Sequence, residues 1–132
     1  MRILLDTHIA LWAIVADPRL PDQARDLIAD PSNSVFVSAA SVWEIAIKHA
    51  LVRARPDDMP VSGPNALSFF RQSGYELLPV TAEHAAAVSD LPPLHRDPFD
   101  RMIITQALLE PLRLITHDPI VKSYNSNGIL LV

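Results

Sequence analysis

The chain has 132 residues, no cysteine and a formal net charge of −4, and 49% of its residues are hydrophobic and 20% charged. This length and composition are typical of a single globular domain over residues 1–132 and exclude a disordered chain. The lack of cysteine excludes disulfide scaffolds and thiolate metal sites, and we expect a cytoplasmic protein. The negative net charge gives no general attraction to nucleic acid.

The first half of the chain alternates between short apolar strands and longer helical patterns. In chain order it predicts a strand at 2–5, helices at 7–16 and 21–30, a strand at 34–37 and a helix at 38–52. Thr7 is expected to be the N-cap of the first helix, and Ser41 and Glu44 have the spacing of a capping box in the third. Asp6 and His8 interrupt the N-terminal apolar run, which is also too short to cross a bilayer, so we expect neither a signal peptide nor a membrane partner.

The second half begins with a charged, proline-containing loop and then resumes the alternation. In chain order it predicts a loop at 53–64, a helix at 64–74, a strand at 75–80, helices at 81–90 and 98–110, and strands at 113–116 and 128–132. Gly74 should end the first of these helices, Thr81 should cap the second, and Pro98 fits the first turn of the third. The alternation favours an α/β fold of three layers, α/β/α, in which helices cover both faces of a central, mostly parallel sheet of four to five strands.

Acidic side chains gather near the ends of these predicted strands. Asp6 directly follows the first strand, Glu44 lies on the helix after the second, and Asp118 comes two residues after the fourth. Asp97 and Asp100 open the last long helix. Because ligands of parallel sheets bind beyond the carboxyl ends of the strands, we expect these carboxylates to meet at one edge, where their mutual repulsion would need a cation.

The chemistry of the acids indicates which cation. Carboxylate and water ligands suit hard ions, so Mg²⁺ or Mn²⁺ is the expected cofactor, whereas zinc more commonly recruits histidine or cysteine, and the five histidines have no recognised zinc spacing. Such ions activate a water molecule and neutralise the leaving oxygen in phosphodiester hydrolysis. A path for phosphates is only weakly indicated by the scattered basic residues Lys48, Arg53, Arg55, Arg96 and Arg101.

Each acidic residue also has a purely structural interpretation. Asp97 before Pro98 suits an N-cap and Asp100 complements the helix dipole, so this pair alone supports a structural and a functional role about equally. Glu44 could serve only the capping box, and Asp118 could cap a short terminal helix. Asp6 is the firmest candidate, because a carboxylate between two apolar segments should be partly buried and would need partners.

Four segments of the chain carry a family resemblance, and they are ILLDTHIALW at the N-terminus, SVFVSAASVWEIAIK, HRDPFDRMIITQA and LITHD. Together they resemble the PIN domain, and more narrowly its VapC type, the toxin half of type II toxin–antitoxin pairs. The resemblance spans nearly the whole chain, with the motifs in the family's order. It implies a PIN-like α/β/α nuclease fold and a Mg²⁺- or Mn²⁺-dependent endoribonuclease.

The resemblance also implies roles for individual residues and partners. The family's metal-holding quartet of acids matches Asp6, Glu44, Asp100 and Asp118, and Asp97 matches an additional catalytic acid. Thr7 and Thr116 match polar positions that support the quartet through hydrogen bonds. The implied partners are an RNA substrate, a cognate antitoxin protein and a second copy of the chain in a homodimer.

Rival functions fit the residues less well. A phosphatase of the haloacid-dehalogenase type needs a second aspartate two positions after the first, where His8 stands, and a response-regulator receiver needs an aspartate after a middle strand. The chain has three glycines and no glycine-rich phosphate loop. A solitary RNA-processing or DNA-acting PIN nuclease and a non-catalytic PIN-fold binding module remain as alternatives, and the complete set of acids argues against the binding module.

Overall fold

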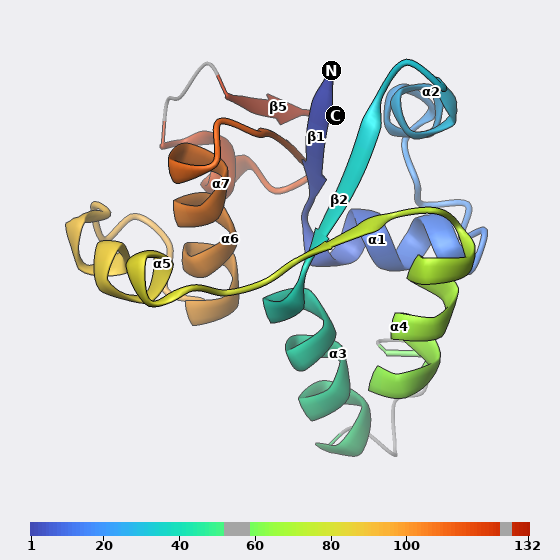
Figure 1. The fold of residues 1–132 in the computed structure, drawn as a ribbon, viewed down its shortest axis with the longest axis horizontal. Helices are drawn as coiled ribbons and strands as arrows, with labels where there is room; N and C mark the ends of the chain where they lie inside the picture. Colours follow the sequence, from blue (N-terminus) through green and yellow to red (C-terminus); the bar gives the residue numbers. More distant parts are fainter. Residues whose placement is uncertain (52–58, 125–127) are drawn as a thin grey trace.

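A computed structural model describes residues 1–51, 59–124 and 128–132 of the chain (Figure 1). Its elements follow in the order β1 (Arg2–Leu5), α1 (Thr7–Ile14), α2 (Asp22–Ala29), β2 (Ser34–Ser38), α3 (Ala39–Leu51), α4 (Gly63–Gln72), β3 (Glu76–Leu78), α5 (Ala82–Ala87), η1 (Val88–Asp90), α6 (Pro98–Leu109), β4 (Arg113–Thr116), α7 (Pro119–Lys122) and β5 (Ile129–Leu131). η1 is a short 3-10 helix. Each strand and helix expected from the sequence has a counterpart, and α7 is the short terminal helix named in the structural interpretation of Asp118.

The five strands form one parallel sheet in the order β3-β2-β1-β4-β5. β1 lies in the middle, where Leu5 is in register with Val37 of β2 and with Ile115 of β4. This confirms the predicted α/β class and the parallel sheet. Because all strands point the same way, their carboxyl ends meet at one edge, which is the lower edge in Figure 1.

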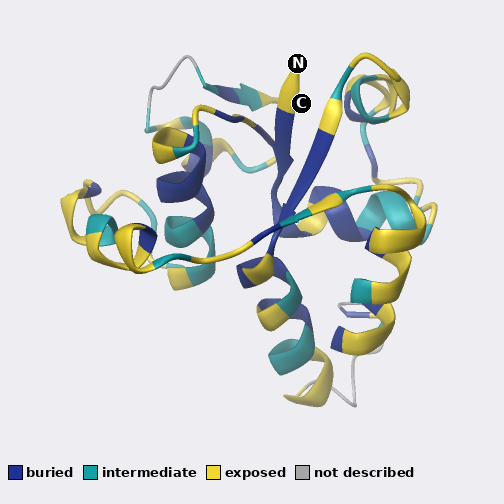
Figure 2. Ribbon diagram, in the orientation of Figure 1, coloured by how far each residue is buried: buried dark blue, intermediate teal, exposed yellow. Residues whose placement is uncertain are grey.

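Residues along the central strands alternate between two apolar layers. Ile3 and Leu5 of β1 pack on the side that also holds buried residues of α1, α2 and α4, whereas Leu4 packs on the side of α6. Figure 2 shows the two central strands β1 and β2 buried along most of their length, with exposed residues only at their starts. Helices therefore cover both faces, which explains why the strands read as continuous apolar runs.

Two helix starts differ from the prediction because an earlier side chain provides the cap. Asp6, and not Thr7, is the N-cap of α1, since Asp6 Oδ1 accepts a hydrogen bond from the Ile9 N–H at 2.9 Å. α3 begins at Ala39, after a Ser38 hydroxyl that accepts from the Ala40 N–H at 3.0 Å. Ser41 consequently lies inside the helix, and the capping box predicted for Ser41 and Glu44 is wrong.

Other boundaries were predicted more closely. Thr81 caps α5 as expected, in a capping box completed by the ring of His84, and Gly74 follows α4 with a positive φ of 80°. α1 ends at Ile14, two residues earlier than predicted, and Ala16 just beyond it has a positive φ of 52°. The first half of the loop expected at 53–64 lies outside the described residues, and α4 already begins at Gly63. No helix within the described ranges has the length and apolar character needed to cross a membrane.

Candidate active site

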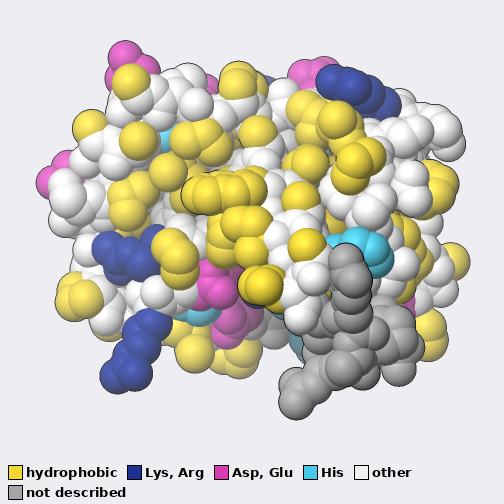
Figure 3. All heavy atoms as spheres, turned by 90° about the horizontal axis from the view of Figure 1, so that it is seen from below, with side chains coloured by type: hydrophobic (Ala, Val, Ile, Leu, Met, Phe, Trp, Pro, Cys, Tyr) yellow, Lys and Arg dark blue, Asp and Glu magenta, His cyan; other side chains and the backbone are white. Residues whose placement is uncertain are grey.

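The acidic residues singled out in the sequence lie at the carboxyl edge of the sheet. Asp6 follows β1, Glu44 lies on the helix that follows β2, and Asp118 comes just after β4. Asp97 and Asp100 stand at the start of α6, which runs back along the sheet before β4. Figure 3 looks onto this edge and shows acidic side chains beside a hydrophobic area, with basic side chains to one side.

Three of the aspartates divide their two oxygens between a helix cap and the site. Asp6 Oδ1, Asp97 Oδ1 and Asp118 Oδ1 accept backbone N–H groups at the starts of α1, α6 and α7. Their Oδ2 atoms face other side chains, which are Thr116 for Asp6, Lys48 for Asp97 and His95 for Asp118. Capping and a role in the site are therefore compatible, because the cap fixes each side chain's rotamer and leaves one oxygen for the site.

Thr116 joins two of these aspartates. Its hydroxyl donates to Asp6 Oδ2 at 2.5 Å and accepts from the Asp118 N–H at 3.0 Å. Asp6 is 7% exposed, and burial raises the pKa of its carboxyl, an effect that the hydrogen bonds from Thr116 and the Ile9 N–H only partly offset. The hydroxyl of Thr7 instead donates to Ser41 Oγ at 3.0 Å and so ties α1 to α3. The expected support of the acids by Thr7 stays a prediction.

Glu44 is the most deeply buried of the acids, with 2% of its surface exposed. Its Oε2 accepts from Lys48 Nζ at 2.5 Å, and Lys48 Nζ also lies 3.9 Å from Asp97 Oδ2. Burial acts to lower the pKa of Lys48, but the hydrogen bond and charge of Glu44, with the charges of Asp97 and Asp100, outweigh it and raise that pKa. Lys48 is thus a cation built into the acidic site.

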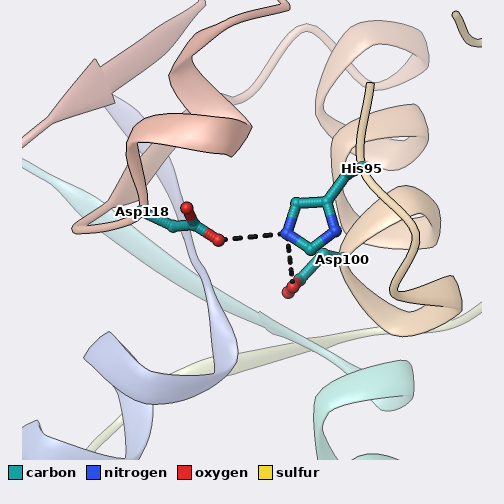
Figure 4. A group of neighbouring side chains, drawn as sticks. All are labelled: His95, Asp100 and Asp118. Atoms are coloured by element: carbon teal, nitrogen blue, oxygen red, sulfur yellow. Dashed lines mark hydrogen bonds and ion pairs between the residues drawn. The ribbon is translucent and has the colours of Figure 1, made fainter. Parts of the chain in front are cut away.

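The ring of His95 lies between Asp100 and Asp118 (Figure 4). His95 Nε2 is 3.1 Å from Asp100 Oδ2 and 3.0 Å from Asp118 Oδ2. Within residues 1–51, 59–124 and 128–132, these three side chains form the one group whose potential ligand atoms all lie within 4.8 Å of one another. Asp6 and Glu44 do not join that group, although their charges act on it: burial, Asp97 and Glu44 raise the pKa of Asp100 to about 7 against the effect of His95, and Asp6 adds to the rise.

The family model of the PIN domain matches residues 3–126. The chain belongs to the PIN domain family. No relative was found among curated protein sequences. Solved structures with the same fold include VapBC2 from Rickettsia felis bound to a DNA fragment from their promoter, with a TM-score of 0.67 and 18% identity over 100% of this chain and 98% of the other. A toxin–antitoxin complex from Klebsiella pneumoniae has a TM-score of 0.60 and 19% identity over 97% of this chain and 95% of the other. FitAcB from Neisseria gonorrhoeae has a TM-score of 0.61 and 17% identity over 98% of this chain and 96% of the other.

The residues of the site fit a hard divalent cation. Glu44 Oε1 is buried and has no hydrogen-bond partner among the described residues. A buried carboxylate oxygen without a partner is costly, and burial together with the charges of Asp97 and Glu44 raises the pKa of Asp100, so a bound cation would stabilise both groups. The candidate ligands of the site are the carboxylate oxygens of Asp6, Glu44, Asp100 and Asp118, and carboxylate oxygen is the donor type that Mg²⁺ and Mn²⁺ prefer.

Two residues of the HRDPFDR segment have roles that the sequence interpretation missed. No role was expected of His95 from the sequence, in which the histidines have no zinc spacing, and its place two residues before Asp97 was the one available signal. Arg101 was considered as a phosphate contact, but its guanidinium donates to the carbonyls of Val88, Leu91, Pro92 and His95 and to the Tyr124 hydroxyl. Arg101 therefore holds the loop before α6. Of the other basic candidates, Arg96 is exposed, and Arg53 and Arg55 lie outside the described residues.

Proposed function

We propose that the chain is a Mg²⁺- or Mn²⁺-dependent endoribonuclease and the VapC-type toxin of a type II toxin–antitoxin pair. The observation that carries this proposal is the gathering of acids from β1, α3, α6 and β4 at one edge of a PIN fold, with a buried oxygen of Glu44 left unpartnered. Such an arrangement is unfavourable for folding alone, because like charges repel and buried carboxylates lose hydration. It is favourable when a cation is bound.

Asp6, Glu44, Asp100 and Asp118 would hold the ion. When bound, a divalent ion supplies Lewis-acid chemistry, which makes an attacking water more acidic and stabilises charge on the leaving oxygen. Asp6 and Asp118 present their Oδ2 atoms because their Oδ1 atoms are fixed in helix caps. Asp97 or Asp100 accepts the proton of the attacking water, since both carboxylates lie beside the site at the start of α6.

Lys48 would act on the substrate side of the site. Its ammonium group bonds to Glu44, and about a third of its side chain is exposed. A phosphodiester approaching the acids meets their negative charge, and Lys48 Nζ offsets part of this repulsion. We propose RNA as the substrate, with products that carry a 5′-phosphate and a 3′-hydroxyl, on the strength of the resemblance of the four motifs to VapC-type nucleases.

We also propose that the chain binds a cognate antitoxin and forms a homodimer. The similar structures from Rickettsia felis and Klebsiella pneumoniae are a VapBC2 assembly and a toxin–antitoxin complex. Large apolar side chains are exposed beside the acidic site, and Trp43, 63% exposed, packs edge-on against Phe99 with ring centroids 5.1 Å apart. Exposed aromatic surface of this kind is typical of protein interfaces.

The experiment that tests the proposal is cleavage of a defined RNA pool by purified protein with Mg²⁺, with Mn²⁺ and with a chelator. Asp6→Asn and Asp100→Asn are expected to abolish cleavage, and Asp26→Asn, the same change at an exposed position of α2, is expected to leave it intact. Cleavage that persists in chelator would refute metal dependence. Metal binding without cleavage of RNA would favour a DNA-acting nuclease or a binding module. A separate observation, an adjacent gene for a small antitoxin-like protein, would distinguish a toxin from a solitary nuclease.

A further inference from the structure

The hydrogen bonds of His95 determine which of its ring nitrogens carries the hydrogen. His95 Nδ1 accepts a hydrogen bond from the backbone N–H of Asp97 at 3.0 Å. A backbone N–H can only donate, so Nδ1 must present its lone pair. In the neutral ring the hydrogen is then on Nε2, the atom that lies 3.0 Å from Asp118 Oδ2 and 3.1 Å from Asp100 Oδ2.

We infer that His95 is a positioning residue of the acidic site: its Nε2–H donates to Asp118 Oδ2, Asp100 Oδ2 lies 3.1 Å from the same nitrogen, and the ring does not ligate the metal. This inference rests on the proposed function, because positioning Asp100 and Asp118 matters only if the acids bind a metal ion. Asp100 comes from α6 and Asp118 from the residues after β4, so the two carboxylates belong to different elements. A donor between them brings their oxygens to within 4.8 Å of one another before any cation arrives (Figure 4).

The alternative, in which His95 joins Asp100 and Asp118 as a third ligand, conflicts with this hydrogen-bond pattern. A metal bound at Nε2 needs the lone pair of that nitrogen, so the ring hydrogen would have to be on Nδ1. The hydrogen on Nδ1 would then face the backbone N–H of Asp97, and the hydrogen bond between Asp97 and His95 would be lost. That bond fixes the residue that caps α6, so the change would loosen the start of the helix that carries Asp100.

The backbone of His95 is also held from two sides. Its N–H donates to the Tyr124 hydroxyl at 3.0 Å, and its carbonyl accepts from Arg101 at 3.4 Å. Tyr124 in turn donates to the Pro92 carbonyl at 2.8 Å. Only 11% of the His95 side chain is exposed. The ring therefore has little freedom to turn, as expected of a residue that orients metal-binding carboxylates, a role whose removal typically weakens metal affinity.

The first test reads the ring directly in the metal-free protein. Nitrogen-15 NMR of the histidine side chains is expected to show His95 with hydrogen on Nε2 and with an unprotonated Nδ1. A hydrogen on Nδ1 would overturn the inference. This measurement requires neither RNA nor activity, so it separates failure of the inference from failure of the proposed function.

The second test compares Mn²⁺ affinity, measured by titration calorimetry, among variants shown to be folded by circular dichroism. His95→Leu is expected to weaken Mn²⁺ binding by about 10- to 100-fold. His95→Gln should recover most of the affinity. The amide nitrogen of glutamine reaches about as far as Nε2 and can donate a hydrogen bond, but it is a poor metal ligand. His117→Leu is the matched control, since the His117 side chain bonds to the Val132 carbonyl and not to the acids.

The outcomes of the second test are unambiguous. Equal losses in His95→Gln and His95→Leu would assign a ligand role to the ring and contradict the inference. Unchanged affinity in His95→Leu, or no Mn²⁺ binding by the wild-type protein, would also overturn it. Recovered affinity in His95→Gln, together with no cleavage of RNA by the wild-type protein, would support the role of His95 and refute the proposed ribonuclease.

Discussion

Replacing Asp100 by asparagine is expected to stabilise the metal-free protein at neutral and alkaline pH. Burial, together with the charges of Asp97 and Glu44, raises the pKa of Asp100 from its ordinary value of 3.8 to about 7. A tenfold change in proton affinity corresponds to about 1.4 kcal/mol, so this difference corresponds to at most roughly 4 kcal/mol. Solvent reaches the 21% of the side chain that is exposed, and the measured gain should be smaller.

The pH dependence of this effect has a definite sign. Between about pH 4 and pH 7 the folded protein holds a proton on Asp100 that the unfolded chain has released. The free energy of unfolding therefore falls as pH rises through this range, and the penalty is complete above about pH 7. Asp100→Asn removes the ionisable group, so its advantage over the wild-type protein should be small at pH 4 and largest at pH 8.

Urea denaturation at both pH values, with a chelator present, measures the effect. Asp26→Asn on the exposed side of α2 is the control and should change little at either pH. Addition of Mn²⁺ should reverse the order at pH 8, because the wild-type site gains the binding energy of the ion and the variant does not. A variant that is less stable than the wild-type protein at pH 8 without metal would refute the reasoning.

Three further predictions concern neighbours of the acids. Thr116→Val should lower the free energy of unfolding by about 1–3 kcal/mol in urea denaturation, because Asp6 Oδ2 loses its donor in a buried place, and an unchanged value would contradict this role. Lys48→Met should lower the thermal unfolding temperature of the metal-free protein, because Glu44 loses its partner. With Mn²⁺ present the difference from the wild-type protein should shrink, since Glu44 then has the ion as its partner. A difference that Mn²⁺ leaves unchanged would contradict this role of Lys48. Arg101→Lys should speed backbone hydrogen exchange between Val88 and His95 and leave β1 protected, because lysine lacks the forked donors that bind several carbonyls at once. Equal exchange rates in the variant and the wild-type protein would show that Arg101 does not hold this loop.

Local patterns of the sequence were sufficient to predict most of the fold. The strands at 2–5 and 34–37 are short apolar runs that only a sheet covered on both faces can bury, and Thr81 and Pro98 mark helix starts by their own chemistry. The convergence of the acids could be predicted from the parallel topology, since each follows a strand, opens a helix or lies in the first turns of a helix at the same edge. Such inferences need no knowledge of distant contacts.

The errors and omissions arise where distant residues decide the outcome. Ser41 and Glu44 have the spacing of a capping box, but Ser38 caps the helix earlier and Thr7 occupies the Ser41 hydroxyl. The role of His95 depends on Asp118, 23 residues further along the chain, and no local pattern encodes that meeting. Arg101 could not be separated from a substrate-binding arginine, because its carbonyl partners are arranged only by the folded loop.

The central claim is that carboxylates from separate elements meet in order to hold a hard divalent ion. Anomalous diffraction from crystals grown with Mn²⁺ locates the ion and its ligands directly. The account predicts one or more peaks among the carboxylate oxygens of Asp6, Glu44, Asp100 and Asp118, with His95 Nε2 outside the ligand set. A peak ligated by His95, or no peak between these carboxylates, would contradict it.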